Sequence, residues 1–350
     1  MSESQFRVGI SQGIRCADGE MVVPEFDLSP LDNDPLIECV GLPDTAALAS
    51  DTAAGLDAVI LMLESVTQKT FETPGRLSLV ARFGVGYDRI DVGACTRNAV
   101  ALAITPDGVR RPVAVSIITL MLALTSRLMV KDRIAREGAT GWARKAQYNG
   151  VGLVGRTLGS LGMGNIGSEV FKLAQPFDMH FIAHDPYADG RTAAALGVTL
   201  VSLEDLFRES DILSVSCPLS ETTRGIVDGP MLELMKASAF LINTSRGPVI
   251  DQTALFEILQ AKRIAGAGLD VLEQEPPEDD DPILSLDNVI LAPHALCWTD
   301  QCMAGNGAAD VAAVQSTMGG HSPAHVVNSA VLDTPKFKRR LSEYAKRFGS

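Results

Sequence analysis

The stretch Thr157-Leu158-Gly159-Ser160-Leu161-Gly162-Met163-Gly164-Asn165-Ile166-Gly167 joins an apolar run to glycines in GxGxxG spacing. It predicts a strand, a tight loop and then a helix. Gly162 permits the turn, Gly164 lets a pyrophosphate approach the backbone, and Gly167 lets helix and strand pack closely. The unpaired N–H groups at the start of the helix would bind the phosphates. The pattern favours a dinucleotide-binding unit over a merely structural glycine turn.

A carboxylate follows the next predicted strand. Residues 181–184 are Phe-Ile-Ala-His, and Asp185 comes directly after them, 18 residues past the last glycine of the loop. An Asp at this place can accept hydrogen bonds from the adenosine ribose hydroxyls and would repel a 2′-phosphate. The order strand, glycine loop, helix, strand, Asp therefore predicts NAD rather than NADP.

Short β-branched and apolar runs recur along the whole chain, and segments with apolar residues at helical spacing separate most of them. Strands that alternate with helices predict parallel sheets built from right-handed βαβ units. The clearest predicted strands are 6–10, 58–61, 77–83, 100–104, 157–163, 180–184, 212–216, 239–244, 266–272 and 289–292, and the clearest helices are 166–174, 203–207 and 253–260.

The length of 350 residues suggests two domains. We expect residues 1–106 to form one α/β domain that is completed by 301–350, and residues 107–300 to form the other. A long helix that begins near Pro112 should connect them, because proline is favourable in the first turn of a helix.

The C-terminal segment predicts an amphipathic helix. Thr334 can cap it and Pro335 suits its first turn. Its basic residues invite a nucleic-acid hypothesis, but a docked helix with a solvated basic face is the simpler interpretation. The apolar positions on one helical face are Phe337, Leu341, Tyr344 and Phe348.

Composition excludes several classes of protein. A hydrophobic fraction of 46% excludes disorder, and a net charge of −13 argues against nucleic-acid or anionic-membrane partners. The most apolar stretch, 112–124, is shorter than 18 residues and suits a buried helix. The N-terminal residues show no secretory signal, and no CxxC pair is present. We therefore expect a soluble cytoplasmic protein in which the cysteines are reduced thiols: Cys16, Cys39, Cys95, Cys217, Cys297 and Cys302.

Three downstream segments each place a polar side chain just beyond a predicted strand. Arg246 follows Leu-Ile-Asn-Thr-Ser, Glu275 lies in Glu-Gln-Glu-Pro, and His294 follows Leu-Ala-Pro. Ligands bind at the carboxyl ends of strands in doubly wound sheets. We expect the three side chains to converge on one crevice.

Together these segments resemble the D-isomer-specific 2-hydroxyacid dehydrogenases, the family of phosphoglycerate dehydrogenase, glyoxylate/hydroxypyruvate reductase and D-lactate dehydrogenase. The resemblance covers nearly the whole chain, in an ordered series that is far more specific than any one motif. The segments that carry it are 81–88, 105–109, 157–167, 184–187, 217–220, 243–247, 270–276 and 293–294.

The resemblance implies an α/β fold of two Rossmann/flavodoxin-like, doubly wound parallel-sheet domains separated by a cleft. It implies that the domain formed by 1–106 and 301–350 binds substrate and that 107–300 binds NAD. It also implies a homodimer, since family members usually dimerise through the cofactor domain. The reaction would transfer a hydride between NAD and a small D-2-hydroxy acid or 2-oxo acid.

The resemblance also implies roles for individual residues. His294 would be the general acid/base, and Glu275 would hydrogen-bond it and favour its protonated form. Arg246 would grip the substrate carboxylate and the reacting oxygen with its guanidinium fork. The backbone N–H groups of Val85 and Gly86 would hold the same carboxylate, so that Arg246 and His294 share the substrate with this loop.

The cofactor-binding positions that the resemblance implies lie on six segments. They are Gly162, Met163, Gly164, Asn165, Ile166, Gly167, Asp185, Cys217, Pro218, Thr223, Thr244, Ser245, Asp270 and His294. No metal is expected, because the acid run 278–281 lacks ligand spacing and is interpreted as a solvated loop. The other histidines, His180, His184, His321 and His325, are expected to be structural.

The chain departs from the family pattern in four places. Val115 stands where the family usually has Glu, and Asn165 stands where Arg is frequent. Residues 295–298, Ala-Leu-Cys-Trp, are bulkier than usual, which suggests that Trp298 lines or covers the substrate pocket. Nothing follows residue 350, so no regulatory domain is expected. These features argue against phosphoglycerate as the substrate more than they argue against the proposed reaction.

Three alternatives stay open. Formate dehydrogenase of the same superfamily is the nearest enzymatic rival, although it expects an amide partner for the histidine, which Glu275 is not. Phosphite dehydrogenase shares the Arg–Glu–His set. The C-terminal-binding-protein corepressors keep the fold and the triad but act as NADH-sensitive scaffolds, and turnover with a 2-oxo acid would distinguish them.

Overall fold

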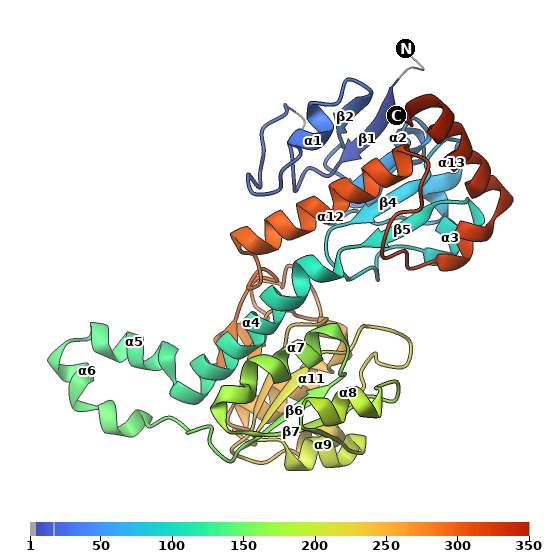
Figure 1. Ribbon diagram of the computed structural model, residues 1–350. Helices are drawn as coiled ribbons and strands as arrows, with labels where there is room; N and C mark the ends of the chain where they lie inside the picture. Colours follow the sequence, from blue (N-terminus) through green and yellow to red (C-terminus); the bar gives the residue numbers. More distant parts are fainter. Residues whose placement is uncertain (1–4, 17, 350) are drawn as a thin grey trace. The chain divides into compact units, whose positions relative to one another are not determined.

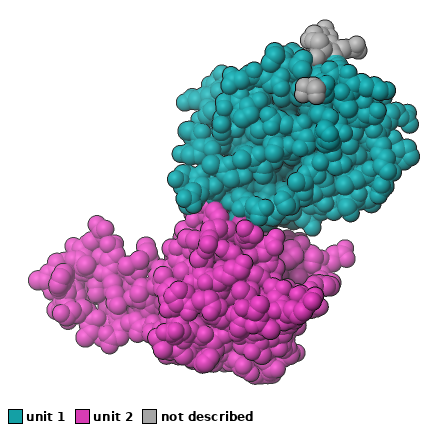
Figure 2. Space-filling view, in the orientation of Figure 1, with its two compact units in different colours: residues 1–109, 298–350 teal, residues 110–297 magenta. Residues whose placement is uncertain are grey.

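The computed structural model describes residues 5–16 and 18–349, which form two compact units. Unit 1 consists of Met1–Val109 and Trp298–Ser350, and unit 2 consists of Arg110–Cys297. Figure 2 shows the two units in different colours. Each unit has its own parallel sheet, as expected of a two-domain α/β protein.

The chain crosses between the units close to the places that the sequence indicated. The crossings follow residues 109 and 297, whereas the expected ones followed 106 and 300. The binding roles expected for the two domains stay predictions. Residues 1–4, on which the expected lack of a secretory signal partly depends, lie outside the described residues.

Unit 1 is built on a five-stranded parallel sheet with the order β2-β1-β3-β4-β5 (Figure 1). The order reverses between β1 and β3, as in flavodoxin-like doubly wound sheets. Apart from the edge strand β2, the strands are mostly apolar on both faces, because helices cover both sides of such a sheet. The five strands are β1 Phe6–Ile10, β2 Ile37–Gly41, β3 Ala58–Leu61, β4 Leu79–Arg82 and β5 Ala101–Ile104.

The C-terminal helix docks on unit 1 as predicted. The Thr334 hydroxyl accepts the Phe337 N–H, and all four apolar residues of the predicted face are buried. The rings of Tyr344 and Phe348 lie 5.1 and 5.8 Å from the ring of Phe6 on β1. The helices of unit 1 are α1 Ser29–Asp32, α2 Ser50–Ala54, α3 Val92–Arg97, α12 Asp300–Met318 and α13 Pro335–Phe348.

Unit 2 is built on a seven-stranded parallel sheet with the order β12-β11-β10-β9-β6-β7-β8. The order reverses between β6 and β9, which makes their carboxyl ends the switch point where ligands bind. The strands are β6 Thr157–Leu161, β7 His180–His184, β8 Val198–Leu200, β9 Ile212–Val215, β10 Phe240–Asn243, β11 Gly266–Leu269 and β12 Val289–Leu291. The helices are α5 Leu128–Arg136, α6 Ala139–Ala143, α7 Asn165–Ala174, α8 Gly190–Ala195, α9 Leu203–Glu209, α10 Gly229–Glu233 and α11 Gln252–Gln260.

The connecting helix corrects one prediction. α4 runs from Pro106 to Ser126, so it begins six residues before Pro112, which lies inside it. Pro106 occupies the first position, where its missing N–H has no cost, and buried apolar residues continue the helix through the second proline. By length and composition alone α4 could cross a membrane, but 56% of its apolar window is buried, as in a core helix.

Two edge strands were not predicted, and several predicted strands are shorter in the structure. β2 has the sequence Ile-Glu-Cys-Val-Gly and β8 has only three residues, so neither shows a clear apolar run. The predicted strand 266–272 ends at Leu269, and 239–244 ends at Asn243. The residues removed from these carboxyl ends form the loops that carry the candidate site.

Candidate active site

The glycine loop lies between β6 and α7, and glycine is required at its three motif positions for different structural reasons. Gly162 has φ +96°, and a Cβ there would lie 2.9 Å from the Cys217 nitrogen. A Cβ on Gly167 would lie 2.4 Å from the Gly162 oxygen. A Cβ on Gly164 would meet no protein atom within 4 Å. Packing therefore explains two of the glycines, whereas Gly164 borders open space in which a pyrophosphate fits.

The same loop offers donors for an anion. No side chain caps the N-terminus of α7, which has ten residues. The Asp185 carboxylate at the end of β7 accepts the Met163 N–H at 2.8 Å through Oδ2 and the Tyr187 N–H at 2.8 Å through Oδ1. Asp185 thus holds the glycine loop, a contact that sequence reasoning did not anticipate. These residues fit a dinucleotide phosphate group.

The loop after β9 lies across the switch point from the glycine loop. Cys217 is buried there, and burial raises the pKa of its thiol to about 11, so the thiol is neutral. The Thr223 hydroxyl donates to the Pro218 carbonyl at 2.6 Å and accepts the Ser220 N–H at 2.8 Å. Its hydroxyl is thereby used to close this loop.

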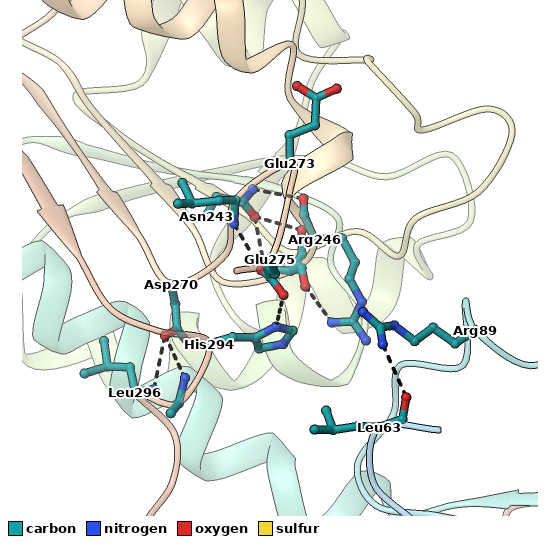
Figure 3. Close-up of polar contacts among 12 residues, drawn as sticks. Leu63, Arg89, Asn243, Arg246, Asp270, Glu273, Glu275, His294 and Leu296 are labelled. Atoms are coloured by element: carbon teal, nitrogen blue, oxygen red, sulfur yellow. Dashed lines mark hydrogen bonds and ion pairs between the residues drawn. The ribbon is translucent and has the colours of Figure 1, made fainter. Parts of the chain in front are cut away.

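His294 and Glu275 form a direct pair. His294 Nδ1 lies 2.7 Å from Glu275 Oε2, and Figure 3 shows the two side chains pointing toward each other. Glu275 Oε1 accepts the Leu272 N–H at 3.0 Å. Burial raises the pKa of this carboxyl, but the hydrogen bond and charge of His294, the Leu272 N–H and the charge of Arg246 together outweigh burial. The pKa of Glu275 therefore lies below its ordinary value, and the carboxylate is ionised at neutral pH.

The backbone at His294 is held by a buried carboxylate. His294 has φ +53°, in the left-handed region that a non-glycine residue rarely adopts. Asp270 Oδ1 accepts the N–H groups of Ala295 and Leu296, each at 3.1 Å (Figure 3). Burial raises the pKa of Asp270 against the opposing effect of these two N–H groups. Sequence reasoning placed Asp270 only among cofactor contacts and missed this support of the His294 turn.

Arg246 lies in a turn that Asn243 closes. Asn243 Oδ1 accepts the Ser245 N–H at 3.0 Å and the Ser245 hydroxyl at 2.9 Å, and its Nδ2 donates to the Arg246 carbonyl at 3.0 Å. Arg246 Nη1 donates to the Ser245 carbonyl at 2.7 Å. The turn thus fixes the Arg246 backbone and one arm of its guanidinium. Thr244, another predicted cofactor contact, lies in the same turn.

Glycine at position 247 brings two site loops together. A Cβ on Gly247 would lie 1.9 Å from the Leu272 carbonyl oxygen, which no backbone could accept without moving. The Arg246 turn therefore packs directly against the segment that leads to Glu275. Because β10, β11 and β12 are neighbours in one parallel sheet, the loops that follow them share one edge. The structure thus brings Arg246, Glu275 and His294 together, as the sequence indicated.

The predicted carboxylate-binding loop belongs to unit 1. Val85 and Gly86 follow β4, after Gly84, which has φ +89°. Arg89 Nη1 donates to the Leu63 carbonyl at 3.3 Å and so joins this segment to the loop after β3 (Figure 3). Unit 1 therefore presents the loop at the carboxyl edge of its own sheet.

Two of the other histidines and one residue of the acid run make local contacts. His184 Nδ1 lies 3.0 Å from the Val201 carbonyl oxygen, and His325 Nε2 lies 3.7 Å from Asp107 Oδ2. Asp281, in the acid run, caps the 3-10 helix Pro282–Ser285 and accepts Gln252 Nε2 at 2.9 Å. In residues 5–16 and 18–349, no group of three or more His, Cys, Asp or Glu is arranged to hold a metal ion.

Two relatives match this chain over about three quarters of its length. The glyoxylate reductase of Korarchaeum cryptofilum is 39% identical over 256 residues, which cover 72% of this chain and 77% of that protein. The D-3-phosphoglycerate dehydrogenase of Methanocaldococcus jannaschii is 36% identical over 276 residues, 78% of this chain. The match covers 52% of that second protein, so this chain spans about half of its length.

Two solved structures are similar to this chain over nearly its whole length. A glyoxylate reductase from Paecilomyes thermophila is 26% identical with a TM-score of 0.77, and the match covers 90% of this chain and 96% of that one. An acyclic imino acid reductase, solved in complex with NADPH and D-Arg, is 25% identical with a TM-score of 0.80 and coverages of 92% and 100%.

A glycine loop at the switch point of a doubly wound sheet, with a His–Glu pair and an arginine on the same sheet edge, defines a class, the nicotinamide-dependent oxidoreductases. The family model described as D-isomer specific 2-hydroxyacid dehydrogenase, NAD binding domain, matches residues 118–295. The chain belongs to this family, and the two predicted sheets and the NAD cofactor are confirmed.

Proposed function

We propose that the protein interconverts a small 2-oxo acid and the corresponding D-2-hydroxy acid with NAD(H). The observation that carries the proposal is the 2.7 Å contact between His294 and an ionised Glu275, on the sheet edge that also presents Arg246. When bound, the dinucleotide supplies or accepts the hydride. A carboxylate that holds one ring nitrogen of a histidine leaves the other nitrogen to exchange a proton with substrate.

The roles of the chain's own groups follow from this arrangement. His294 Nδ1 is engaged with Glu275, so Nε2 is the nitrogen that gives a proton to the carbonyl oxygen of the substrate. The Arg246 guanidinium provides planar donors for the substrate carboxylate and the reacting oxygen. The N–H groups of Val85 and Gly86 provide donors for the same carboxylate. The proton on His294 and the donors of Arg246 stabilise the negative charge that develops on the reacting oxygen.

Substitution of Glu275 tests the acid/base pair. Reduction needs a protonated His294, and the anion of Glu275 favours that proton. Glu275→Gln removes the anion, so the proton leaves at lower pH. We expect the pH at which reduction falls off to decrease, measured as kcat/KM against pH with a 2-oxo acid and NADH.

Glu273→Gln is the matched control for this experiment. Glu273 lies two residues before Glu275, is exposed, and points away from the site in Figure 3. Its pH profile should coincide with that of the wild type. An unshifted profile with full activity in Glu275→Gln would show that Glu275 is not the functional partner of His294.

Asp185 should make NADH strongly preferred over NADPH, because its carboxylate repels a 2′-phosphate. Asp185→Asn removes the charge but keeps an oxygen that accepts the Met163 N–H. We expect this variant to lower the NADH/NADPH ratio of kcat/KM by roughly 10-fold. Asp185→Ala also releases the Met163 N–H and should raise the KM of both cofactors. Equal use of both cofactors by the wild type would contradict the assignment.

The substrate class follows from the relatives and from the site. The relatives reported above act, by their names, on glyoxylate or on 3-phosphoglycerate, and the donors at Arg246, Val85 and Gly86 suit any small 2-oxo acid. We propose glyoxylate, hydroxypyruvate or a close analogue. A panel of these acids and pyruvate, assayed with NADH and NADPH, tests the proposal, and absence of turnover with every member would refute it.

We propose a homodimer formed through unit 2. α5 and α6 extend away from the unit 2 sheet in Figure 1 and expose large apolar side chains. Leu128 is 55% exposed, Met129 58% and Trp142 62%. Light scattering at micromolar concentration should give twice the chain mass of 37.2 kDa, and Trp142→Glu should shift the mass toward the monomer. A monomeric wild type would contradict the proposal.

We also propose that the protein works in the cytoplasm without nucleic-acid or membrane partners. The net charge of −13 and six cysteines without a CxxC pair support this assignment. Fractionation of cells with an antibody to the protein would test it, and recovery in the membrane fraction would contradict it.

A further inference from the structure

The N–H of Gly84, at the start of the proposed carboxylate-binding loop, is held by two buried side chains. It donates to Thr105 Oγ1 at 2.7 Å and to Asn306 Oδ1 at 3.1 Å. The Thr105 hydroxyl also hydrogen-bonds Asn306 Oδ1. Asn306 is fully buried and Thr105 is 2% exposed, so solvent cannot replace either acceptor.

The amide of Asn306 is itself oriented by its own helix. Its Nδ2 donates to the Cys302 carbonyl at 2.7 Å and lies 3.4 Å from Cys302 Sγ. With Nδ2 used in this way, Oδ1 must face Gly84 and Thr105. The side chain is therefore an acceptor fixed in direction toward the loop.

Close packing brings α12 near enough for this contact. A Cβ on Gly108, in the first turn of α4, would lie 2.7 Å from the Asn306 nitrogen and 3.0 Å from the Gly305 carbonyl carbon. A Cβ on Gly305 would lie 3.1 Å from the Gly108 Cα. Glycine at both positions lets the helices touch along their backbones, so that the short Asn306 side chain reaches Gly84.

The next two N–H groups of the loop differ from that of Gly84. Gly84 has φ +89°, and after it the N–H groups of Val85 and Gly86 have no hydrogen-bond acceptor among the described residues of the chain. One N–H of the loop is thus bound inward by Asn306 and Thr105, and the following two are left for a ligand.

We propose that Asn306, with Thr105, is a positioning residue for substrate binding. It holds Gly84 in the left-handed conformation and so presents the N–H groups of Val85 and Gly86 to the substrate carboxylate. The inference deepens the proposed function and rests on it. Neither side chain touches the reacting atoms, so removal of their acceptors affects substrate affinity and leaves the hydride and proton transfers unchanged.

Steady-state kinetics with glyoxylate, or with the best acid of the panel, tests the proposal. Asn306→Leu removes the acceptor at similar volume and leaves the buried Gly84 N–H with one partner. We expect KM for the acid to rise roughly 10-fold, with kcat within about 3-fold of wild type and the NADH Kd unchanged. Thr105→Val should raise KM in the same direction, whereas Thr105→Ser, which keeps the hydroxyl, should retain the wild-type KM.

Thr317→Val is the matched control on the same helix. Thr317 is fully buried and donates to the Ala313 carbonyl at 2.9 Å, away from the loop. It should lower thermal stability as Asn306→Leu does, yet leave KM unchanged. A rise in KM in Thr317→Val equal to that in Asn306→Leu would overturn the positioning role, as would a fall in kcat at unchanged KM.

Amide hydrogen exchange of the free protein gives a readout that does not need activity. A peptide that covers residues 83–90 should exchange faster in Asn306→Leu than in wild type, and Thr317→Val should not change it. Equal exchange in wild type and Asn306→Leu would overturn the inference. An inactive wild type with this difference in exchange would refute the proposed function but not the support of the loop by Asn306.

Discussion

Replacement of His294 by alanine should lower kcat for 2-oxo acid reduction by roughly 10²–10⁴-fold, the range that a positioned general acid contributes. The reason is geometric. Glu275 lies 2.7 Å from Nδ1 of His294, and Asp270 accepts hydrogen bonds from the backbone that follows it. The orientation of the ring is therefore fixed, and Nε2 is left to give a proton to the substrate. Alanine leaves the reacting oxygen without a proton donor, and water in the space cannot be held in the same place. Single-turnover kinetics with NADH measures the loss directly.

Two measurements separate this effect from general damage. The NADH Kd, obtained by fluorescence titration, should change little, because the glycine loop and Asp185 lie on other strands of the sheet. His180→Ala, an exposed histidine at the start of β7, should have wild-type kcat. A His294→Ala variant with kcat within a few-fold of wild type would mean that another group supplies the proton.

Replacement of Arg246 by lysine should lower kcat/KM for the acid by roughly 10- to 100-fold, the loss expected for hydrogen bonds to a charged group. An ammonium keeps the charge but cannot donate along two parallel directions, so it cannot serve both the carboxylate and the reacting oxygen. The Ser245 carbonyl that Arg246 Nη1 binds at 2.7 Å would also lose a fixed donor. KM should carry most of the change, while the NADH Kd should stay constant.

Arg263→Lys provides the same chemical change at an exposed position after α11. It should have wild-type kinetics with every acid of the panel. If Arg246→Lys also retained wild-type kcat/KM, Arg246 would not be needed to bind the substrate carboxylate. The N–H groups of Val85 and Gly86 would then be the only proposed donors left for it.

Much of this protein could be predicted from residues that act through local sequence. The GxGxxG spacing led to the β6–loop–α7 unit, and the apolar face of the last helix led to the docking of α13 on unit 1. Arg246, Glu275 and His294 could be singled out because each follows an apolar run that forms a strand. In a parallel sheet the end of a strand is enough to assign a side chain to the ligand edge.

The tertiary structure alone decided which groups support these residues. Asp270 holds the turn at His294, Gly247 lets the Arg246 turn touch Leu272, and Asn306 reaches Gly84 from a helix 222 residues away in sequence. No local pattern marks such contacts, because each depends on how closely two distant segments approach.

Local pattern and tertiary packing conflict at one further place. Pro112 suits the first turn of a helix, yet it lies within α4, where the burial of Val109 before it and Ala114 after it outweighs one missing hydrogen bond. The sequence by itself therefore determined the elements and the chemical groups at their ends, since these depend on hydrophobic periodicity and turn chemistry. Only the packed structure decided element boundaries and supporting contacts, because burial and close approach are properties of the whole chain.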